Sequence, residues 1–108
     1  MKARIAIAAL GLAASPLPAT PPPAPHDHVM AIAAMRFGPS PAGVRAGDTI
    51  VWVNRDAVQH SATARDRSFD VVVQPGRSVR MMVRRAGAVA FYCRFHPTMQ
   101  GQLAVVAR

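Results

Sequence analysis

The sequence predicts an all-β domain, a sandwich or a barrel, over residues 29–108. Turn-forming residues recur through this region, for example at Gly38, Gly47, Asn54, Pro75 and Gly87, and leave segments of about 5 to 9 residues between them. These segments are rich in Val, Ile and aromatic residues, which favour strands. None of them carries the roughly ten residues of helical periodicity that would indicate a helix.

Seven segments between the turns fit short strands. Alternation along the sixth segment places Val89, Phe91 and Cys93 on one face of its strand. Cys93 is therefore expected at the end of a strand, on its apolar side. In chain order, the expected strands are Val29–Phe37, Thr49–Asn54, Val58–Ala64, Phe69–Val73, Arg77–Val83, Ala88–Cys93 and Gly101–Ala107.

The first residues have the layout of a secretory signal peptide. Lys2 and Arg4 form a basic start, and Ile5 to Ala14 is an uncharged run that is too short to span a bilayer. We predict a signal peptide at residues 1–19, with the cleavage position left open, export to the periplasm and no stable membrane insertion. The alternative is an N-terminal strand or helix of the core.

A proline-rich linker is expected at residues 20–28, before the domain at 29–108. It ends in His26-Asp27-His28. Two histidines in this arrangement can hold a transition metal weakly, and the alternative is a pair of solvated side chains. The sequence leaves both open.

The chain is basic, because 13 Lys and Arg against 5 Asp and Glu give a net charge of +8. Removal of Lys2 and Arg4 with the signal peptide lowers this charge to +6. The basic residues are scattered, and Arg84-Arg85 is the only adjacent pair. Since nucleic-acid-binding arms carry Lys and Arg in tracts, the sequence argues against a nucleic-acid partner. The charge instead favours solubility and acidic partners.

Cys93 is the only cysteine, so the chain has no internal disulfide, no zinc site built on two or four cysteines and no all-cysteine iron–sulfur cluster. In an exported protein such a cysteine pairs with another chain, stays free or is bound to a ligand.

The residues after Cys93 favour binding. Cys93, His96 and Met99 follow at three-residue steps in a loop that ends at Gly101. His60 lies on a different expected strand, which a sandwich can bring beside this loop. Two imidazoles, one thiolate and a weak axial thioether are the ligands of blue-copper electron-transfer sites. Taken singly, each residue has a plainer explanation, as core packing for Cys93 and Met99 or as a polar strand residue for His60.

Residues along most of the domain resemble the small cupredoxins of the plastocyanin, pseudoazurin and amicyanin group. The gap of two residues between His96 and Met99 is similar to that of amicyanins. The resemblance implies an antiparallel Greek-key β-sandwich of about seven to eight strands. It also implies one type 1 copper ion held by His60, Cys93, His96 and Met99. The similar stretches are Phe37–Pro41, Val44–Asn54, Asp56–His60, Phe69, Gln74–Gly76, Gly87 and Phe91–Gly101.

The chain departs from this group beside the first histidine. In plastocyanins and amicyanins a proline commonly precedes that histidine, and an asparagine follows it and ties the two ligand loops together. Here Gln59 and Ser61 stand in those places. We expect Ser61 to hydrogen-bond to the Cys93 loop through its hydroxyl or its backbone.

Together these features predict a monomeric periplasmic blue-copper protein that shuttles one electron through Cu(I)/Cu(II) and is not an enzyme. The resemblance implies redox proteins as partners and an electron port at His96, and Arg94 beside that port favours partners with an acidic docking face. The alternative is a copper carrier or resistance protein without an electron-shuttle role. An enzyme with a Cys93 nucleophile would leave Met99 unexplained and would lack a separate oxyanion site. A purely structural binding module would not explain the ligand set.

Overall fold

The computed structural model describes residues 2–6, 8–18 and 24–108. The described residues form nine strands and no helix, which confirms the all-β prediction. None of them therefore forms a helix long and apolar enough to cross a membrane. The strands are β1 (Asp27–Ala33), β2 (Arg36–Phe37), β3 (Val44–Arg45), β4 (Thr49–Asn54), β5 (His60–Ala64), β6 (Asp70–Val73), β7 (Ser78–Met82), β8 (Gly87–Tyr92) and β9 (Gln100–Val106).

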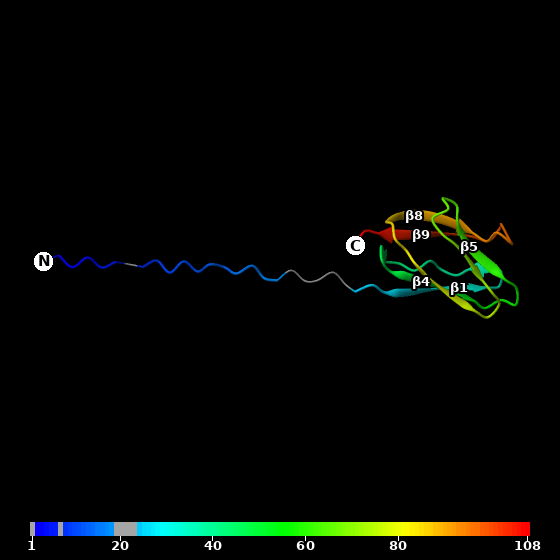
Figure 1. Cartoon of the computed structure of the whole chain (residues 1–108), viewed down its shortest axis with the longest axis horizontal. Coiled ribbons are helices and arrows are strands. Elements are labelled where there is room, and N and C mark those ends of the chain that lie inside the picture. Colours follow the sequence, from blue (N-terminus) through cyan, green and yellow to red (C-terminus); the bar gives the residue numbers. More distant parts are fainter. Residues whose placement is uncertain (1, 7, 19–23) are drawn as a thin grey trace.

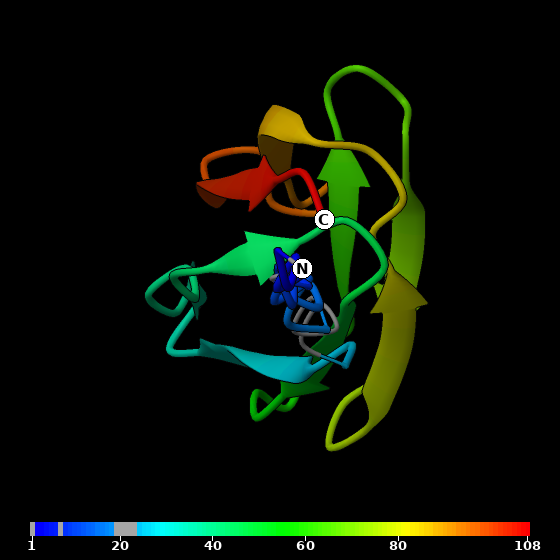
Figure 2. The same ribbon diagram turned by 90° about the vertical axis from the view of Figure 1, so that its left-hand side faces the viewer.

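The strands form two sheets that face one another (Figure 1, Figure 2). One sheet has the order β2-β1-β4-β7 and the other has the order β3-β9-β8-β5-β6. The sandwich is confirmed, but the sheets are mixed and not purely antiparallel. The pairs β1–β4 and β3–β9 are parallel. Parallel neighbours need a long connection between them, and both pairs are far enough apart in the chain to have one.

The first expected strand, Val29–Phe37, is two strands and not one. A tight turn at Ala34 and Met35 separates β1 from β2, and both turn residues have positive φ, 52° and 59°. Non-glycine residues rarely adopt this left-handed conformation without compensation. Here the Asp56 carboxylate accepts hydrogen bonds from both backbone N–H groups, at 2.8 and 2.9 Å. This compensation comes from a distant part of the chain and was not predictable from the local pattern.

The core lies between the sheets and follows the alternation of their strands. In β4 every second residue is buried, Trp52 among them, and β1 and β9 bury alternate residues in their later parts, as at Met30 and Leu103. The Trp52 and Phe91 rings meet edge to face with centroids 5.2 Å apart. Phe37 packs against Phe91 in the same way at 4.8 Å. These aromatic contacts join the sheets next to the end of β8, which Cys93 follows directly.

A buried carboxylate stabilises the end of the domain away from Cys93, where the C-terminus lies (Figure 1). Asp48 is fully buried and accepts hydrogen bonds from the Arg45 backbone N–H, at 2.9 Å, and the His26 backbone N–H, at 3.0 Å. It also contacts His28 Nε2 at 2.9 Å and the Arg108 guanidinium. These contacts hold the pKa of Asp48 well below its ordinary value. The Arg45 N–H has the largest effect, followed by the His26 N–H and His28. Asp48 therefore connects the start of β1, the β3–β4 turn and the C-terminus.

The N-terminal segment contributes little to this fold. Residues 2–6 and 8–18 are exposed and contain no strand. The possible cleavage position after Ala19 and the first residues of the expected linker, 20–23, lie outside the described residues. The linker expected at 20–28 ends inside a strand, because Asp27 and His28 begin β1.

Among the glycines of the chain, Gly101 has the least room for an added Cβ atom. It pairs with Phe91 across β8 and β9, and a Cβ at Gly101 would lie 2.4 Å from Phe91 Cζ. We expect Gly101→Ala to destabilise the domain by about 1–3 kcal/mol, as overpacked cores are. Denaturant unfolding of both proteins measures this difference. Phe91→Leu replaces the ring with a smaller side chain, so it should relieve much of the clash when it is combined with Gly101→Ala. Equal stability of Gly101→Ala and the unaltered chain would contradict the packing described.

Candidate metal centre

The loop between β8 and β9 carries three of the predicted ligands, and backbone hydrogen bonds close it at each step. His96 N donates to Cys93 O at 3.3 Å, and Met99 N donates to His96 O at 2.8 Å. Cys93 N donates to Met99 O at 3.1 Å, so the first and last residues of the motif meet at the base of the loop. Pro97 suits such a turn because its φ is fixed. The three-residue spacing of the motif is the spacing of two consecutive tight turns.

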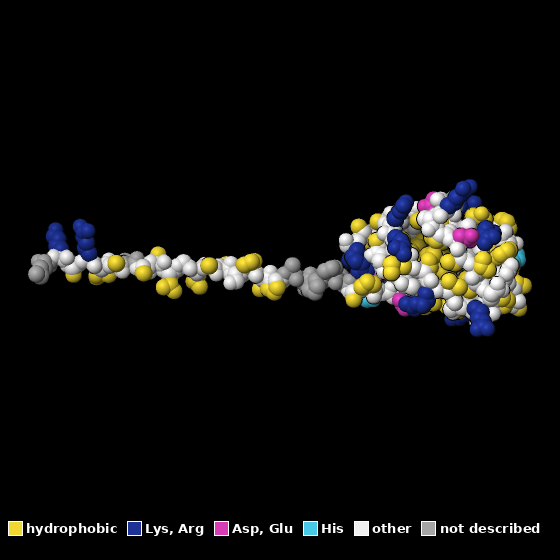
Figure 3. Space-filling view, in the orientation of Figure 1, with side chains coloured by type: hydrophobic (Ala, Val, Ile, Leu, Met, Phe, Trp, Pro, Cys, Tyr) yellow, Lys and Arg dark blue, Asp and Glu magenta, His cyan; other side chains and the backbone are white. Residues whose placement is uncertain are grey.

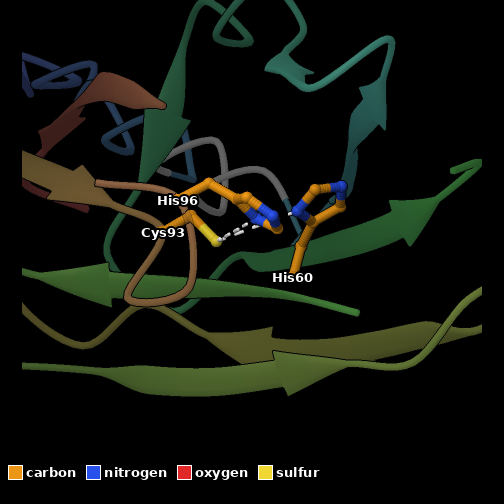
Figure 4. A group of neighbouring side chains, drawn as sticks. All are labelled: His60, Cys93 and His96. Atoms are coloured by element: carbon orange, nitrogen blue, oxygen red, sulfur yellow. Dashed lines mark hydrogen bonds between the residues drawn. The ribbon is translucent and has the colours of Figure 1, made fainter. Parts of the chain in front are cut away.

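His60 reaches the same point from the first position of β5. Its Nδ1 lies 3.8 Å from the Sγ of Cys93, and the Nδ1 of His96 lies at the same distance from that sulfur (Figure 4). The ligand atoms of the three residues all lie within 4.8 Å of one another. Within the described residues, this is the one group of three or more His, Cys, Asp or Glu side chains placed to hold a metal.

Met99, the predicted axial ligand, lies in the same loop and is only 5% exposed. It belongs to the core cluster that also contains Cys93. A surface hollow beside it is lined by Met35, Phe37 and Thr98. The structure therefore places the thioether residue on the buried side of the loop that carries Cys93 and His96.

The Cys93 thiol is fully buried but has polar neighbours. Burial by itself raises the pKa of a thiol, because it disfavours the charged form. The Ser61 backbone N–H donates to Sγ at 3.3 Å. Its effect adds to that of the His60 and His96 rings and the Phe95 backbone N–H. Together these groups outweigh burial and lower the pKa of Cys93 to about 6. The thiolate, which is the form that binds metal, is thus favoured at neutral pH.

Asp56 orients His60 and was not predicted as a site residue. Its Oδ2 lies 2.8 Å from His60 Nε2, on the side of the ring away from the sulfur. A carboxylate accepts from an N–H, so Nε2 carries a proton and Nδ1 is the ring atom that faces Cys93. The Met35 backbone N–H and then His60 lower the pKa of Asp56, which keeps this acceptor ionised. An Asp four residues before the histidine is the only sequence signal for this role.

Ser61 makes the predicted connection to the Cys93 loop, and it makes it twice. Its backbone N–H donates to the Cys93 sulfur, and its hydroxyl accepts from the Arg94 N–H at 2.8 Å. Both groups are buried against the ligand loop. A serine therefore ties the two ligand segments together in place of the asparagine expected from the family resemblance.

The other histidine pair of the sequence, His26 and His28, lies beside a buried carboxylate. His28 Nε2 is engaged with the buried Asp48 carboxylate, whose oxygens are shared with the backbone N–H groups of His26 and Arg45. Among the described residues, His26 and His28 join no group placed to hold an ion.

The β-sandwich and the donor set of two imidazoles, a buried thiolate and a neighbouring thioether fit a type 1 copper site of the cupredoxin class. The chain belongs to the Cupredoxin-like domain family, whose model matches residues 3–105. It is similar to amicyanin of Paracoccus denitrificans, with 25% identity over 83 residues. The match covers 71% of this chain and 63% of that protein, so the chain spans less than two thirds of the length of its curated relative.

Solved structures show the same likeness. A reduced Cu(I) form of an amicyanin variant has 26% identity and a TM-score of 0.61, over 71% of this chain and 79% of that one. Amicyanin from Paracoccus versutus has 23% identity and a TM-score of 0.62, over 71% and 78% of the two chains. The second comparison supports the fold alone.

Titration of the metal-free protein tests the environment of Cys93. We expect its thiolate absorbance in the ultraviolet to appear with a midpoint near pH 6, below the ordinary thiol value of about 8.5. His60→Ala should move the midpoint upward, because it removes one of the groups that lower the pKa. His28→Ala, a histidine at the other end of the domain, is the matched control and should leave it unchanged. A midpoint at or above the ordinary value in the unaltered protein would contradict this description.

Proposed function

We propose that the protein is a blue-copper electron carrier and that His60, Cys93, His96 and Met99 bind its single copper ion. The observation that carries this proposal is the position of the buried Cys93 sulfur, 3.8 Å from the Nδ1 atoms of both histidines. The two imidazoles and the thiolate suit the trigonal plane of such a site, and Met99 suits the weak axial position. Copper, when bound, supplies a one-electron Cu(II)/Cu(I) couple.

The protein's own hydrogen bonds position the residues of the site. Asp56 fixes the His60 ring, and the backbone N–H of Ser61 fixes the sulfur. Hydrogen bonds across the 93–99 loop fix His96 and Met99 relative to Cys93. A site with positioned ligands changes little in geometry when it gains or loses an electron, which favours fast transfer.

The same features favour electron transfer over delivery of copper to an acceptor. His60 and Cys93 are fully buried, so an incoming acceptor ligand would have to open the β5–β8 end of the sandwich to reach them. His96 is only partly buried and offers the shortest way out of the site. An electron can leave along this ring without movement of the ligands, whereas the copper ion cannot.

The proposal includes the place and the mode of action. The basic start and apolar run of residues 1–19 support export to the periplasm by a signal peptide. The domain from residue 29 onward would then act as a monomer that carries electrons between redox proteins and catalyses no reaction of its own. Copper would be held by His60, Cys93, His96 and Met99, which would leave no ligand position for a substrate.

We further propose that the docking face of the redox partner is acidic. The charge of the chain without Lys2 and Arg4 is +6, and Figure 3 shows Lys and Arg side chains spread over the visible face of the domain. Arg94 contributes less than its sequence position suggests, because Asp70 pairs with its Nε at 3.1 Å. The attraction would therefore come from the whole basic surface more than from one residue beside His96.

Added copper tests the centre. We expect Cu(II) to give the domain an intense thiolate-to-copper band in the visible spectrum, and Cys93→Ser to abolish it. Met99→Leu should keep the colour and raise the reduction potential, because Cu(II) loses a donor that it needs more than Cu(I) does. Met81→Leu, a methionine of the core away from the site, is the matched control. A colourless protein that binds only zinc would refute the electron-transfer proposal.

Electrodes coated with charged monolayers test the docking charge without a known partner. We expect the copper-loaded protein to exchange electrons at a carboxylate-coated electrode, and the signal to weaken as salt is added, because salt screens exposed charges beyond about 10 Å at 0.1 M. An amine-coated electrode is the control and should give a weaker signal at low salt. Equal signals on both coatings, or a signal that ignores salt, would contradict an acidic docking face.

A further inference from the structure

A chain of hydroxyl groups runs along β5 from the ligand loop to a carboxylate on β6. The Arg94 backbone N–H donates to Ser61 Oγ at 2.8 Å, and Ser61 Oγ lies 2.9 Å from Thr63 Oγ1. Thr63 Oγ1 donates to Asp70 Oδ1 at 2.7 Å. Ser61 and Thr63 are two residues apart on one strand, so their side chains lie on the same face. Thr63 and Asp70 are cross-strand partners in the register of β5 and β6.

The direction of every hydrogen bond in this chain is fixed by its two ends. A backbone N–H can only donate, and an ionised carboxylate can only accept. The hydrogen bond from Thr63 has the largest effect on the pKa of Asp70, which it lowers, and Arg94 lowers it further. Asp70 therefore stays ionised. Thr63 must therefore give its single proton to Asp70, and Ser61 must give its proton to Thr63. This leaves the lone pairs of the Ser61 oxygen facing Arg94, where the loop needs an acceptor.

The side chain of Arg94 closes the chain into a ring. Its Nε donates to Asp70 Oδ1 at 3.1 Å, so both ends of Arg94 are anchored to the same set of residues. Its guanidinium also lies over the Phe95 ring, with Cζ 5.3 Å from the ring centroid. Ser61 is fully buried and Thr63 is 9% exposed, whereas the Asp70 and Arg94 side chains are about half exposed. The ring thus extends from the protein surface to the residue that contacts the sulfur.

We propose that Thr63, Asp70 and the Arg94 side chain are positioning residues for the thiolate of the copper site. They hold the Ser61 hydroxyl in the orientation that accepts from Arg94, and so hold the Ser61 backbone N–H against Cys93 Sγ. None of the three contacts the sulfur or either ligand histidine through its side chain. The inference rests on the proposed function for its copper measurement, but its structural part applies to the metal-free protein.

An ordinary surface ion pair between Arg94 and Asp70 would not have this effect. Such pairs contribute little by themselves and are weakened by salt. The buried hydroxyls distinguish the two cases, because a buried hydroxyl that loses its acceptor must find another or stay unsatisfied. Loss of Thr63 Oγ1 should therefore weaken the hydrogen bond of the Arg94 N–H, two hydrogen bonds away, and not only the contacts at the surface.

Amide hydrogen exchange in the metal-free protein tests the structural part. We expect Thr63→Val, which keeps the shape and removes the hydroxyl, to speed exchange at Arg94 by about tenfold or more, with β9 amides such as Leu103 unchanged. Asp70→Ala, which removes the acceptor of the Thr63 hydroxyl at a half-exposed position, should act in the same direction. Thr63→Ser keeps the hydroxyl and should keep exchange at Arg94 slow. Asp66→Ala removes a carboxylate from the turn of the same hairpin and should have no effect at Arg94.

The copper-loaded protein supplies the second measurement. We expect Thr63→Val and Asp70→Ala to shift the reduction potential and the position of the visible band, whereas Thr63→Ser and Asp66→Ala leave both unchanged. Unchanged exchange at Arg94 in the first two variants would overturn the inference, as would an increase spread evenly over all strands. Absence of the visible band in the unaltered protein would instead refute the proposed function, and the exchange result would still decide the structural part.

Discussion

The arrangement of the metal-centre end of the domain depends on one constraint, which is that the Cys93 sulfur is buried together with polar groups that favour its thiolate. A buried thiolate without donors would be costly. The donors come from β5, because the Ser61 N–H and the His60 ring lie at the start of that strand. The pairing of β5 with β8, with Thr63 opposite Tyr92, brings them to the sulfur. A change in the register between β5 and β8 would therefore also move these donors away from the sulfur.

The residues that we propose as ligands could be selected from the sequence because few positions in this chain could carry that chemistry. The single cysteine and the three-residue steps to His96 and Met99 restricted the site to one loop, and the structure brings His60 to that loop. The residues that hold these groups were harder to predict. Short polar residues such as Asp56 and Asp70 are common on exposed turns and strands. Only the folded structure shows that the Asp56 carboxylate reaches His60 and that the Asp70 carboxylate reaches Thr63.

The fold was predictable to the level of its class for a similar reason. Turns and apolar segments specify strands locally, but pairing depends on contacts between distant residues. The parallel pairing of β1 with β4 follows from a crossover that no local pattern encodes. The division of the first expected strand at Ala34 and Met35 is a further case, because both residues adopt positive φ against their local preference. The Asp56 carboxylate stabilises that turn and orients His60, so a departure from local preference lies one hydrogen bond from the site.

The two histidines of the site differ in a way that bears on how an electron would leave it. His60 is fully buried and is held on its far side by Asp56, so its ring has no path to solvent. His96 lies in the loop at the end of the sandwich and is only partly buried. Phe95 beside it is 39% exposed, which gives this end an apolar surface next to the ring. His60 is thus fixed by the core, whereas His96 connects the site with the surface. One histidine can therefore stay rigid while the other lies where a partner could make contact.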